Sequence, residues 1–271
     1  MEEAEELASL DASTRAKRAT ELAAYHQDVV SELSRIRREA LNELVSEGKT
    51  QRELAELLGM TRARIGQLLS SGPQPERALL GTGALTIAVG GKPEGPRLNP
   101  STVVPAEATK ARDLIAETAA SYGLEVTHEV VDPPGLVNLN RPNLVVIGSP
   151  RLLPFVVQVL ESDGHLGFGS GAQGWYLTAG SVVHRSPSDQ GVPADYAYIG
   201  RLPRPDSKGT FLYLAGIHAM GTLAAATYIT DHIDELYRQV KNRRWSVLIE
   251  CCYDPDTRAI KSVEPITPIY S

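Results

Sequence analysis

The stretch FLYLAGIHAMGTLAAATYI, residues 211–229, decides the fold of the larger part of this chain. Its apolar start predicts a strand that ends at Gly216. A short loop with His218 and Gly221 follows, and the alanine-rich run predicts a helix from Thr222 to about Val240. Strand, glycine loop and helix in this order form the repeating unit of α/β proteins with parallel strands.

The chain from residue 83 onward repeats this alternation. Apolar runs predict strands over residues 84–91, 124–131, 143–149 and 194–205, and residues 106–123 predict a helix. Pro154 shortens a second helix over 150–161, and the glycine-rich residues 163–177 have no clear assignment. Residues 245–266 predict a β-hairpin around the turn DPDT. We expect a Rossmann-like, mostly parallel α/β fold with helices on both faces and the C-terminal β-hairpin as an antiparallel edge.

The chain before this region follows a helical pattern. Residues 11–71 are rich in Ala, Leu, Glu and Arg and contain no proline, whereas SSGPQPE at residues 70–76 interrupts helices. The sequence therefore predicts a helical domain over residues 1–72, a linker over 73–82 and an α/β domain over 83–271.

The segment TQRELAELLGMTRARIGQLLS, residues 50–70, carries the most specific motif. Small Ala55 lets a second helix approach the first, Gly59 suits a left-handed turn, and β-branched Ile65 packs back. Leucines at 54, 57, 58 and 68 complete a core at helical spacing. Thr61 is a candidate N-cap of the second helix.

This segment resembles the helix-turn-helix domains of phage repressors and of sigma-factor region four, closely over residues 51–69 and more loosely over 12–71. The resemblance implies double-stranded DNA as a partner. Arg and Gln side chains on the leading face of the second helix can contact guanine and adenine edges, and basic residues before it can meet phosphates. The candidate DNA-binding residues are Arg35, Arg38, Lys49, Gln51, Arg52, Thr61, Arg62, Ala63, Arg64 and Gln67. The alternatives are an ordinary helical hairpin and, for the arginines of residues 31–48, a solvated helix face with ion pairs.

Charge and symmetry bear on this hypothesis. The net charge of −6 excludes a globally basic nucleic-acid binder, but residues 12–72 hold ten Lys or Arg against eight Asp or Glu. One helix-turn-helix reads only one half-site, so we expect a homodimer. The segment 12–33 can either extend the helical bundle or pair with a second chain.

Small residues at the ends of the predicted strands indicate a ligand site in the α/β domain. Open parallel sheets bind ligands beyond the carboxyl ends of their strands, and a helix N-terminus favours anions. Residues 194–205 and 216–229 also resemble a module of nucleotide-sensing Rossmann-like regulators, which implies a pocket and suggests an acid for ribose hydroxyls. The candidate ligand-binding residues are Gly90, Gly91, Lys92, Gly148, Ser149, Asp195, Tyr196, Gly216, His218, Gly221 and Thr222. For each glycine the alternative is a tight turn, and the missing lysine of a P-loop argues against that class of ATPase.

We therefore expect a ligand-responsive transcriptional regulator whose α/β domain senses a small anion such as a nucleotide or sugar phosphate. The alternatives are a nucleotide-processing enzyme with a helical targeting module and a protein-binding adaptor. No spacing of acids, histidines or the adjacent Cys251 and Cys252 predicts a catalytic or metal site. The acidic first residues and the lack of a long apolar run favour a cytoplasmic protein without a membrane segment.

Overall fold

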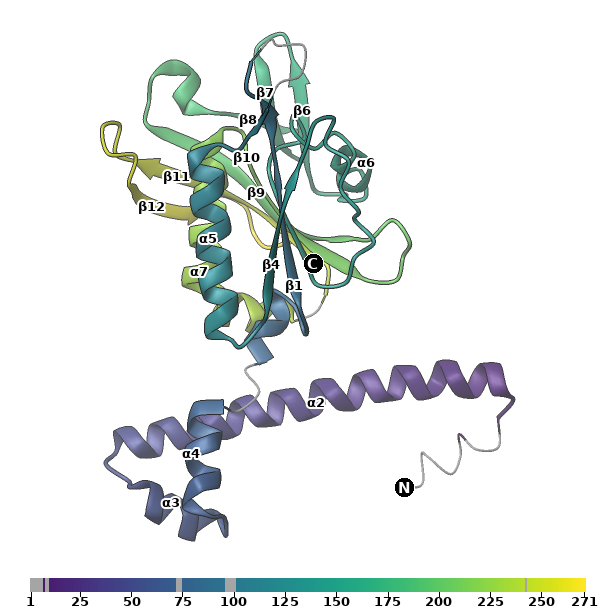
Figure 1. Cartoon of the computed structure of the whole chain (residues 1–271), viewed down its shortest axis with the longest axis vertical. Helices are drawn as coiled ribbons and strands as arrows, with labels where there is room; N and C mark the ends of the chain where they lie inside the picture. Colours follow the sequence, from purple (N-terminus) through teal and green to yellow (C-terminus); the bar gives the residue numbers. More distant parts are fainter. Residues whose placement is uncertain (1–6, 8–9, 72–74, 96–100, 242) are drawn as a thin grey trace. The chain divides into compact units, whose positions relative to one another are not determined.

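The structure is a computed structural model that describes residue 7 and residues 10–71, 75–95, 101–241 and 243–271. The chain divides into two compact units, Met1–Pro75 and Glu76–Ser271. Figure 1 shows both units.

Three helices make up the described part of the first unit. They are α2 (Ala12–Ser46), α3 (Gln51–Leu58) and α4 (Arg62–Ser71). The Asp11 carboxylate caps α2 by accepting hydrogen bonds from the amides of Ser13 and Thr14, both at 3.1 Å. The two helical patterns expected before the motif are one continuous helix, because nothing between residues 12 and 46 interrupts it.

A mixed sheet forms the centre of the second unit. Within the described residues it has seven strands in the order β12-β11-β9-β10-β5-β1-β4. The bounds are β1 Leu85–Gly90, β4 Val126–Val131, β5 Leu144–Ile147, β9 Ala194–Pro203, β10 Thr210–Gly216, β11 Trp245–Tyr253 and β12 Ile260–Pro265. Strands β4, β1, β5 and β10 pair in parallel, whereas β9 is antiparallel to both β10 and β11. The expected parallel core and the C-terminal hairpin of β11 and β12 are confirmed.

The two faces of the sheet are covered differently. Helices α5 (Ala106–Ser121) and α7 (Ala219–Val240) lie side by side on one face, as Figure 1 shows. They enclose a core that includes Ile87, Ile115 and Ile229, each fully buried. The other face packs against the short α6 (Val156–Leu160) and a small antiparallel sheet. Helices therefore lie on both faces of the sheet, as expected, but on the second face the helix is short and the small sheet covers the rest.

The small sheet accounts for the glycine-rich segment that had no assignment. Its strands are β6 (Leu166–Gly171), β7 (Gly174–Ala179) and β8 (Val182–Arg185), paired antiparallel in that order. A side chain at Gly169 would collide with the ring of Tyr176, its cross-strand partner, so the glycine is needed for ring packing. Short pieces complete the unit: β2 (Lys92–Pro93), β3 (Thr102–Val103) and the 3₁₀ turns η1 (Pro75–Leu79) and η2 (Pro187–Gln190).

Part of the expected linker belongs to the α/β unit. Leu79 and Leu80 are buried in the core that α5 and α7 cover, and Arg201 donates hydrogen bonds to the carbonyls of Ala78 and Leu79. The described residues of the linker from 76 onward are therefore structural. In the described chain no helix is both long and apolar enough to cross a membrane.

Candidate functional site

The turn between α3 and α4 follows from local sequence chemistry. Thr50 and Glu53 form a reciprocal capping box at the start of α3: the Glu53 carboxylate accepts from the Thr50 amide at 2.8 Å, and the Thr50 hydroxyl accepts from the Glu53 amide at 3.3 Å. The helix ends at Gly59, whose φ of 61° is left-handed. A Cβ at Gly59 would meet nothing within 4 Å, so backbone conformation alone requires the glycine.

A small core fixes α4 against α2 and α3. Leu54 and Ile65 are fully buried, Ala55 lies between the helices, and Leu41 of α2 and Leu68 complete the cluster. The predicted packing of Ala55, Gly59 and Ile65 thus appears in the structure. Leu57 and Leu58 are instead 65% and 40% exposed, so the expectation that they join the core is wrong. The buried residues of α3 are Leu54 and Ala55.

The N-terminus of α4 faces solvent. The Thr61 hydroxyl accepts a hydrogen bond from the Arg64 amide at 3.1 Å, which is the expected N-cap. Arg62, Ala63 and Arg64 are all exposed, and the first turn of α4 holds no acidic residue. The positive end of this helix dipole and two guanidinium groups therefore present one cationic surface.

The other candidate DNA-binding residues differ in their exposure to solvent and in the contacts they already make. Lys49, Gln51 and Arg52 are exposed near the start of α3. Arg52 pairs with Glu56 at 3.2 Å, but both side chains are largely exposed, so the pair is weak and a phosphate can replace it. Arg38 is half-buried on α2, which limits its reach toward DNA. The side chains of Arg35 and Gln67 lie outside the described part of the structure, although both residues are in helices.

The strand ends that carry most of the candidate ligand-binding residues lie next to one another, as expected. The neighbouring strands β1, β5 and β10 end at Gly90, Ile147 and Gly216, so Gly148 and Ser149 lie beside both other ends. The space over them is filled by the chain itself: a Cβ on Gly90 would come within 3.0 Å of Leu152 and Leu153, and one on Gly91 would overlap Thr102. Packing therefore explains these two glycines, and Lys92 beyond them is exposed.

The expected anion position at the start of α7 holds the chain's own carboxylate. Asp195 is fully buried, and its Oδ2 accepts hydrogen bonds from the amides of His218 and Gly221, both at 2.9 Å. The Gly216 amide donates to the Thr222 hydroxyl at 2.9 Å. A Cβ on Gly221 would come within 2.7 Å of the carboxylate and closer still to the Tyr196 carbonyl. Gly221 thus admits Asp195, where the sequence suggested that it admits a ligand.

Burial dominates the electrostatics of Asp195. Loss of water raises the pKa of the carboxyl group above its ordinary value, and the hydroxyl of Ser186 and the two amides oppose that shift. Asp195 is therefore not presented to ribose hydroxyls in this structure. His218 is paired through Nε2 with Asp189 at 2.8 Å, and half-buried Tyr196 packs edge-on against His184. Loss of water and nearby Glu250 raise the pKa of Tyr196.

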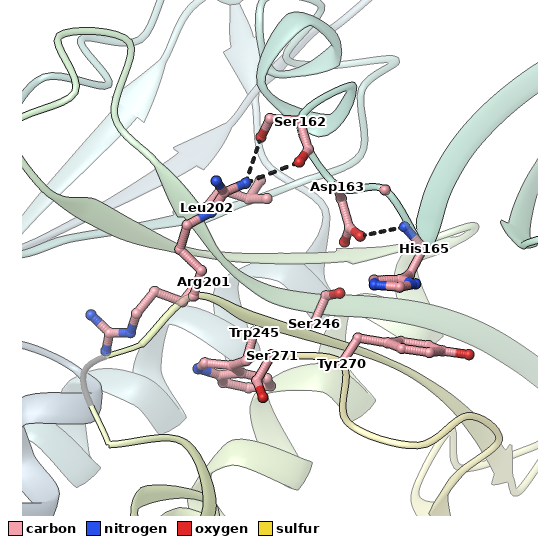
Figure 2. A pocket seen from close by; sticks show the side chains of 11 residues that line it. Ser162, Asp163, His165, Arg201, Leu202, Trp245, Ser246, Tyr270 and Ser271 are labelled. Atoms are coloured by element: carbon pink, nitrogen blue, oxygen red, sulfur yellow. Dashed lines mark hydrogen bonds between the residues drawn. The ribbon is translucent and has the colours of Figure 1, made fainter.

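A cavity of about 330 Å³ lies at the opposite edge of the sheet, where β9 ends and β11 begins (Figure 2). Arg201 and Trp245 are register partners on these two strands. The cavity is lined by Ser162, Asp163, Gly164, His165, Arg201, Leu202, Arg244, Trp245, Ser246, Tyr270 and Ser271. None of these residues was a candidate from the sequence, because they come from four separate segments and no local motif joins them.

Most polar side chains that line this cavity already make hydrogen bonds or ring contacts within the protein. Asp163 accepts from the Tyr198 hydroxyl at 2.8 Å and from the amides of His165 and Leu166. Arg244 donates to the carbonyl and hydroxyl of Ser162 at 3.0 and 3.1 Å. The His165 ring stacks on Tyr270 with centroids 4.4 Å apart.

Arg201 is the unusual charge at this edge. Its guanidinium is buried and donates only to neutral oxygens, the Ala78 and Leu79 carbonyls and the Thr210 hydroxyl. Burial lowers the pKa of Arg201 to about 10. No carboxylate among the described residues pairs with it, whereas buried charges in proteins are usually paired.

Comparison with known proteins assigns no family to the chain: no protein-family model, no curated protein and no solved structure matches it. The described residues also contain no cluster of three or more His, Cys, Asp or Glu placed to hold a metal ion.

Proposed function

We propose that this chain is a transcriptional regulator that binds double-stranded DNA, with α4 as the helix that enters the major groove. The observation that carries the proposal is the capped N-terminus of α4, which presents Arg62, Ala63 and Arg64 to solvent on a helix that Ile65 anchors. The N-terminal residues of a second helix are the ones that reach base edges in helix-turn-helix proteins.

The chemistry of these side chains fits base reading. An arginine can donate two hydrogen bonds to the O6 and N7 of one guanine, which distinguishes that base from the other three. A small residue between two arginines, here Ala63, lets the helix approach the groove and can contact a thymine methyl group. Lys49 and Arg52 then serve as phosphate contacts that set the register of the helix on the duplex.

The test is selection of binding sites from random duplex DNA with the purified full chain. We expect a short enriched sequence, and we expect Arg62→Ala with Arg64→Ala to bind that duplex with affinity no better than its affinity for unrelated DNA. A control with Arg15→Ala and Arg18→Ala removes the same charge from exposed positions far along α2 from the turn. Full-strength specific binding by the Arg62 and Arg64 variant would reject the proposal.

The α/β unit is the proposed sensor of a small anion, such as a nucleotide or a sugar phosphate. The cavity beside Arg201 and Arg244 supports this role better than the loop at Gly216, because Asp195 already engages the loop amides. A volume of about 330 Å³ is at the small end of ligand pockets.

Thermal-shift measurements with a panel of nucleotides and sugar phosphates test the sensor role. A ligand in this cavity should raise the melting temperature of the native chain and lose that effect in Arg244→Ala. Arg243→Ala is the matched control, because the Arg243 guanidinium hydrogen-bonds to carbonyls at the end of α7. An equal shift in both variants would place the ligand elsewhere.

The alternative of a nucleotide-processing enzyme gains no support from Asp195. This carboxylate near the loop is fully buried and accepts two amide hydrogen bonds on one oxygen. No observation in the described residues favours a second function.

A further inference from the structure

The long helix α2 carries an apolar stripe that the described chain leaves exposed. Val30, Leu33 and Ile36 are 54%, 61% and 48% exposed, and Val29 is 37% exposed. By contrast, Leu41 at the C-terminal end of the same helix is buried against α3 and α4. Figure 1 shows the N-terminal half of α2 extending beyond both short helices.

The stripe has the spacing of a coiled-coil seam. Steps of three and four residues alternate without interruption through Ala19, Leu22, His26, Val29, Leu33, Ile36 and Ala40. This is the a and d pattern of three heptads, in which Ala19, His26, Leu33 and Ala40 take the a positions. A helix without a partner for such a stripe exposes apolar area that water disfavours, so an exposed seam of this regularity marks an interface.

We propose that α2 forms a parallel two-stranded coiled coil with α2 of a second copy of this chain. Charge favours the parallel arrangement, because the g position 32 is Glu and the e position 37 that it would face on the second copy is Arg. An antiparallel pair centred on Val29 and Leu33 would instead bring two copies of Glu32 together.

The spacing of the two helix-turn-helix units, α3 and α4 of each chain, also favours the parallel arrangement. This step rests on the proposed DNA-binding function. In the antiparallel pair the two C-terminal ends of α2 would be ~45 Å apart at 1.5 Å per residue. Half-sites one turn of DNA apart need heads ~34 Å apart. The parallel pair brings both helix-turn-helix heads to the same end, where a two-fold axis can relate them.

Sedimentation of the full chain tests the interface. We expect the wild type to sediment as two chains and Leu33→Glu with Ile36→Glu to sediment as one. Val45→Glu is the matched control, because Val45 is also exposed and apolar but takes the outer f position. His26→Leu should lower the dimer dissociation constant, since it replaces the polar residue of the seam. A monomeric wild type, or a dimer that survives the two glutamates, would overturn the proposal.

Disulfide cross-linking tests the orientation. In a Cys252→Ser background, where the remaining Cys251 is buried, Ile36→Cys should give a covalent dimer on mild oxidation and Val45→Cys should not. In the antiparallel pair the two introduced thiols would be ~15 Å apart along the axis, beyond the reach of a disulfide. A dimer without cross-linking at position 36 would overturn the parallel arrangement. The variant with Arg62→Ala and Arg64→Ala should lose specific DNA binding and still dimerise. A failure of DNA binding can therefore be distinguished from a failure of the α2 interface.

Discussion

At the scale of single residues, Asp195 fixes the corner between β9 and α7. It is the second residue of β9, which runs antiparallel to β10, and its carboxylate accepts hydrogen bonds from the His218 and Gly221 amides at the start of α7. A helix N-terminus satisfied in this way does not need an external anion. The glycine loop that the sequence suggests as a ligand site is thereby explained structurally: it lets Asp195 connect β9 to the start of α7.

We expect Asp195→Asn to keep the hydrogen bonds to the His218 and Gly221 amides and Asp195→Ala to lose them and lower the stability of the fold. The amide oxygen of asparagine can accept both backbone hydrogen bonds, whereas alanine leaves each buried amide without an acceptor at a cost of about 1–3 kcal/mol. Chemical denaturation at pH 7 measures both. An alanine variant as stable as the asparagine variant would contradict the role of the carboxylate.

The raised pKa of Asp195 predicts a pH dependence. A carboxyl group whose pKa is higher in the folded state binds its proton more tightly there, so its contribution to stability is greatest below the unfolded pKa of about 4. That contribution is lost as pH rises through the folded pKa. The free energy of unfolding of the wild type should therefore fall relative to Asp195→Asn as pH increases above about 4. A difference between the two proteins that is constant with pH would contradict this.

Gly59 and Gly66 should respond to alanine in opposite directions. Gly59→Ala forces a side chain into the left-handed conformation and should destabilise the turn by about 1–2 kcal/mol. Gly66 lies inside α4, where a Cβ makes only an ordinary contact of 3.8 Å with Gln51, so alanine should stabilise the helix by about 1 kcal/mol. Hydrogen exchange of the α3 and α4 amides measures the two changes, and equal effects of the same sign would refute the assigned backbone roles.

At the scale of elements, α3 and α4 follow closely from the sequence. The capping box, the turn glycine and the Thr61 cap are short-range signals that depend on neighbours in the chain, and the structure contains all three. The exposure of Leu57 and Leu58 was not predictable, since it depends on which other elements cover α3. The small sheet of β6, β7 and β8 was missed because its glycines serve tertiary packing, as at Gly169.

The phosphate and base roles proposed for the helical unit differ in a measurable way. Lys49→Ala and Arg52→Ala should weaken binding equally on all sequences and reduce the slope of log K against log salt by about one each. Arg62→Ala or Arg64→Ala alone should cost about 1–3 kcal/mol and relax the preference at one base position. Binding isotherms on the selected duplex and on single-base variants separate the two patterns, and an unchanged salt slope in Lys49→Ala and Arg52→Ala would remove their phosphate role.

At the scale of the whole molecule, the α/β unit begins at Glu76, inside the expected linker of residues 73–82. The fragment 76–271 keeps Leu79 and Leu80 in the core, whereas a fragment that begins at residue 83 loses them and the carbonyls that hold Arg201. At about 1.5–3 kcal/mol for each buried leucine, the shorter fragment should be less stable by about 3–6 kcal/mol. Denaturant unfolding of both fragments measures the difference in stability. Equal unfolding midpoints would show that residues 76–82 act only as a linker.

The alternation of strands and helices predicted the parallel centre of the sheet, because β1, β5 and β10 are almost entirely apolar and each ends at, or is followed by, a glycine. It could not predict that α5 and α7 share a face. The cavity beside Arg201 and Trp245 was also beyond prediction, since cross-strand register brings these residues together across more than forty positions of sequence.

Methylation interference at guanine N7, on the duplex selected by the full chain, tests DNA reading by α4 most directly. We expect methylation of particular guanines in each half-site to block binding of the wild type, and Arg62→Ala or Arg64→Ala to remove the interference at one guanine of each half-site. Wild-type binding that no guanine methylation disturbs, or an interference pattern that both alanine variants leave unchanged, would contradict this expectation.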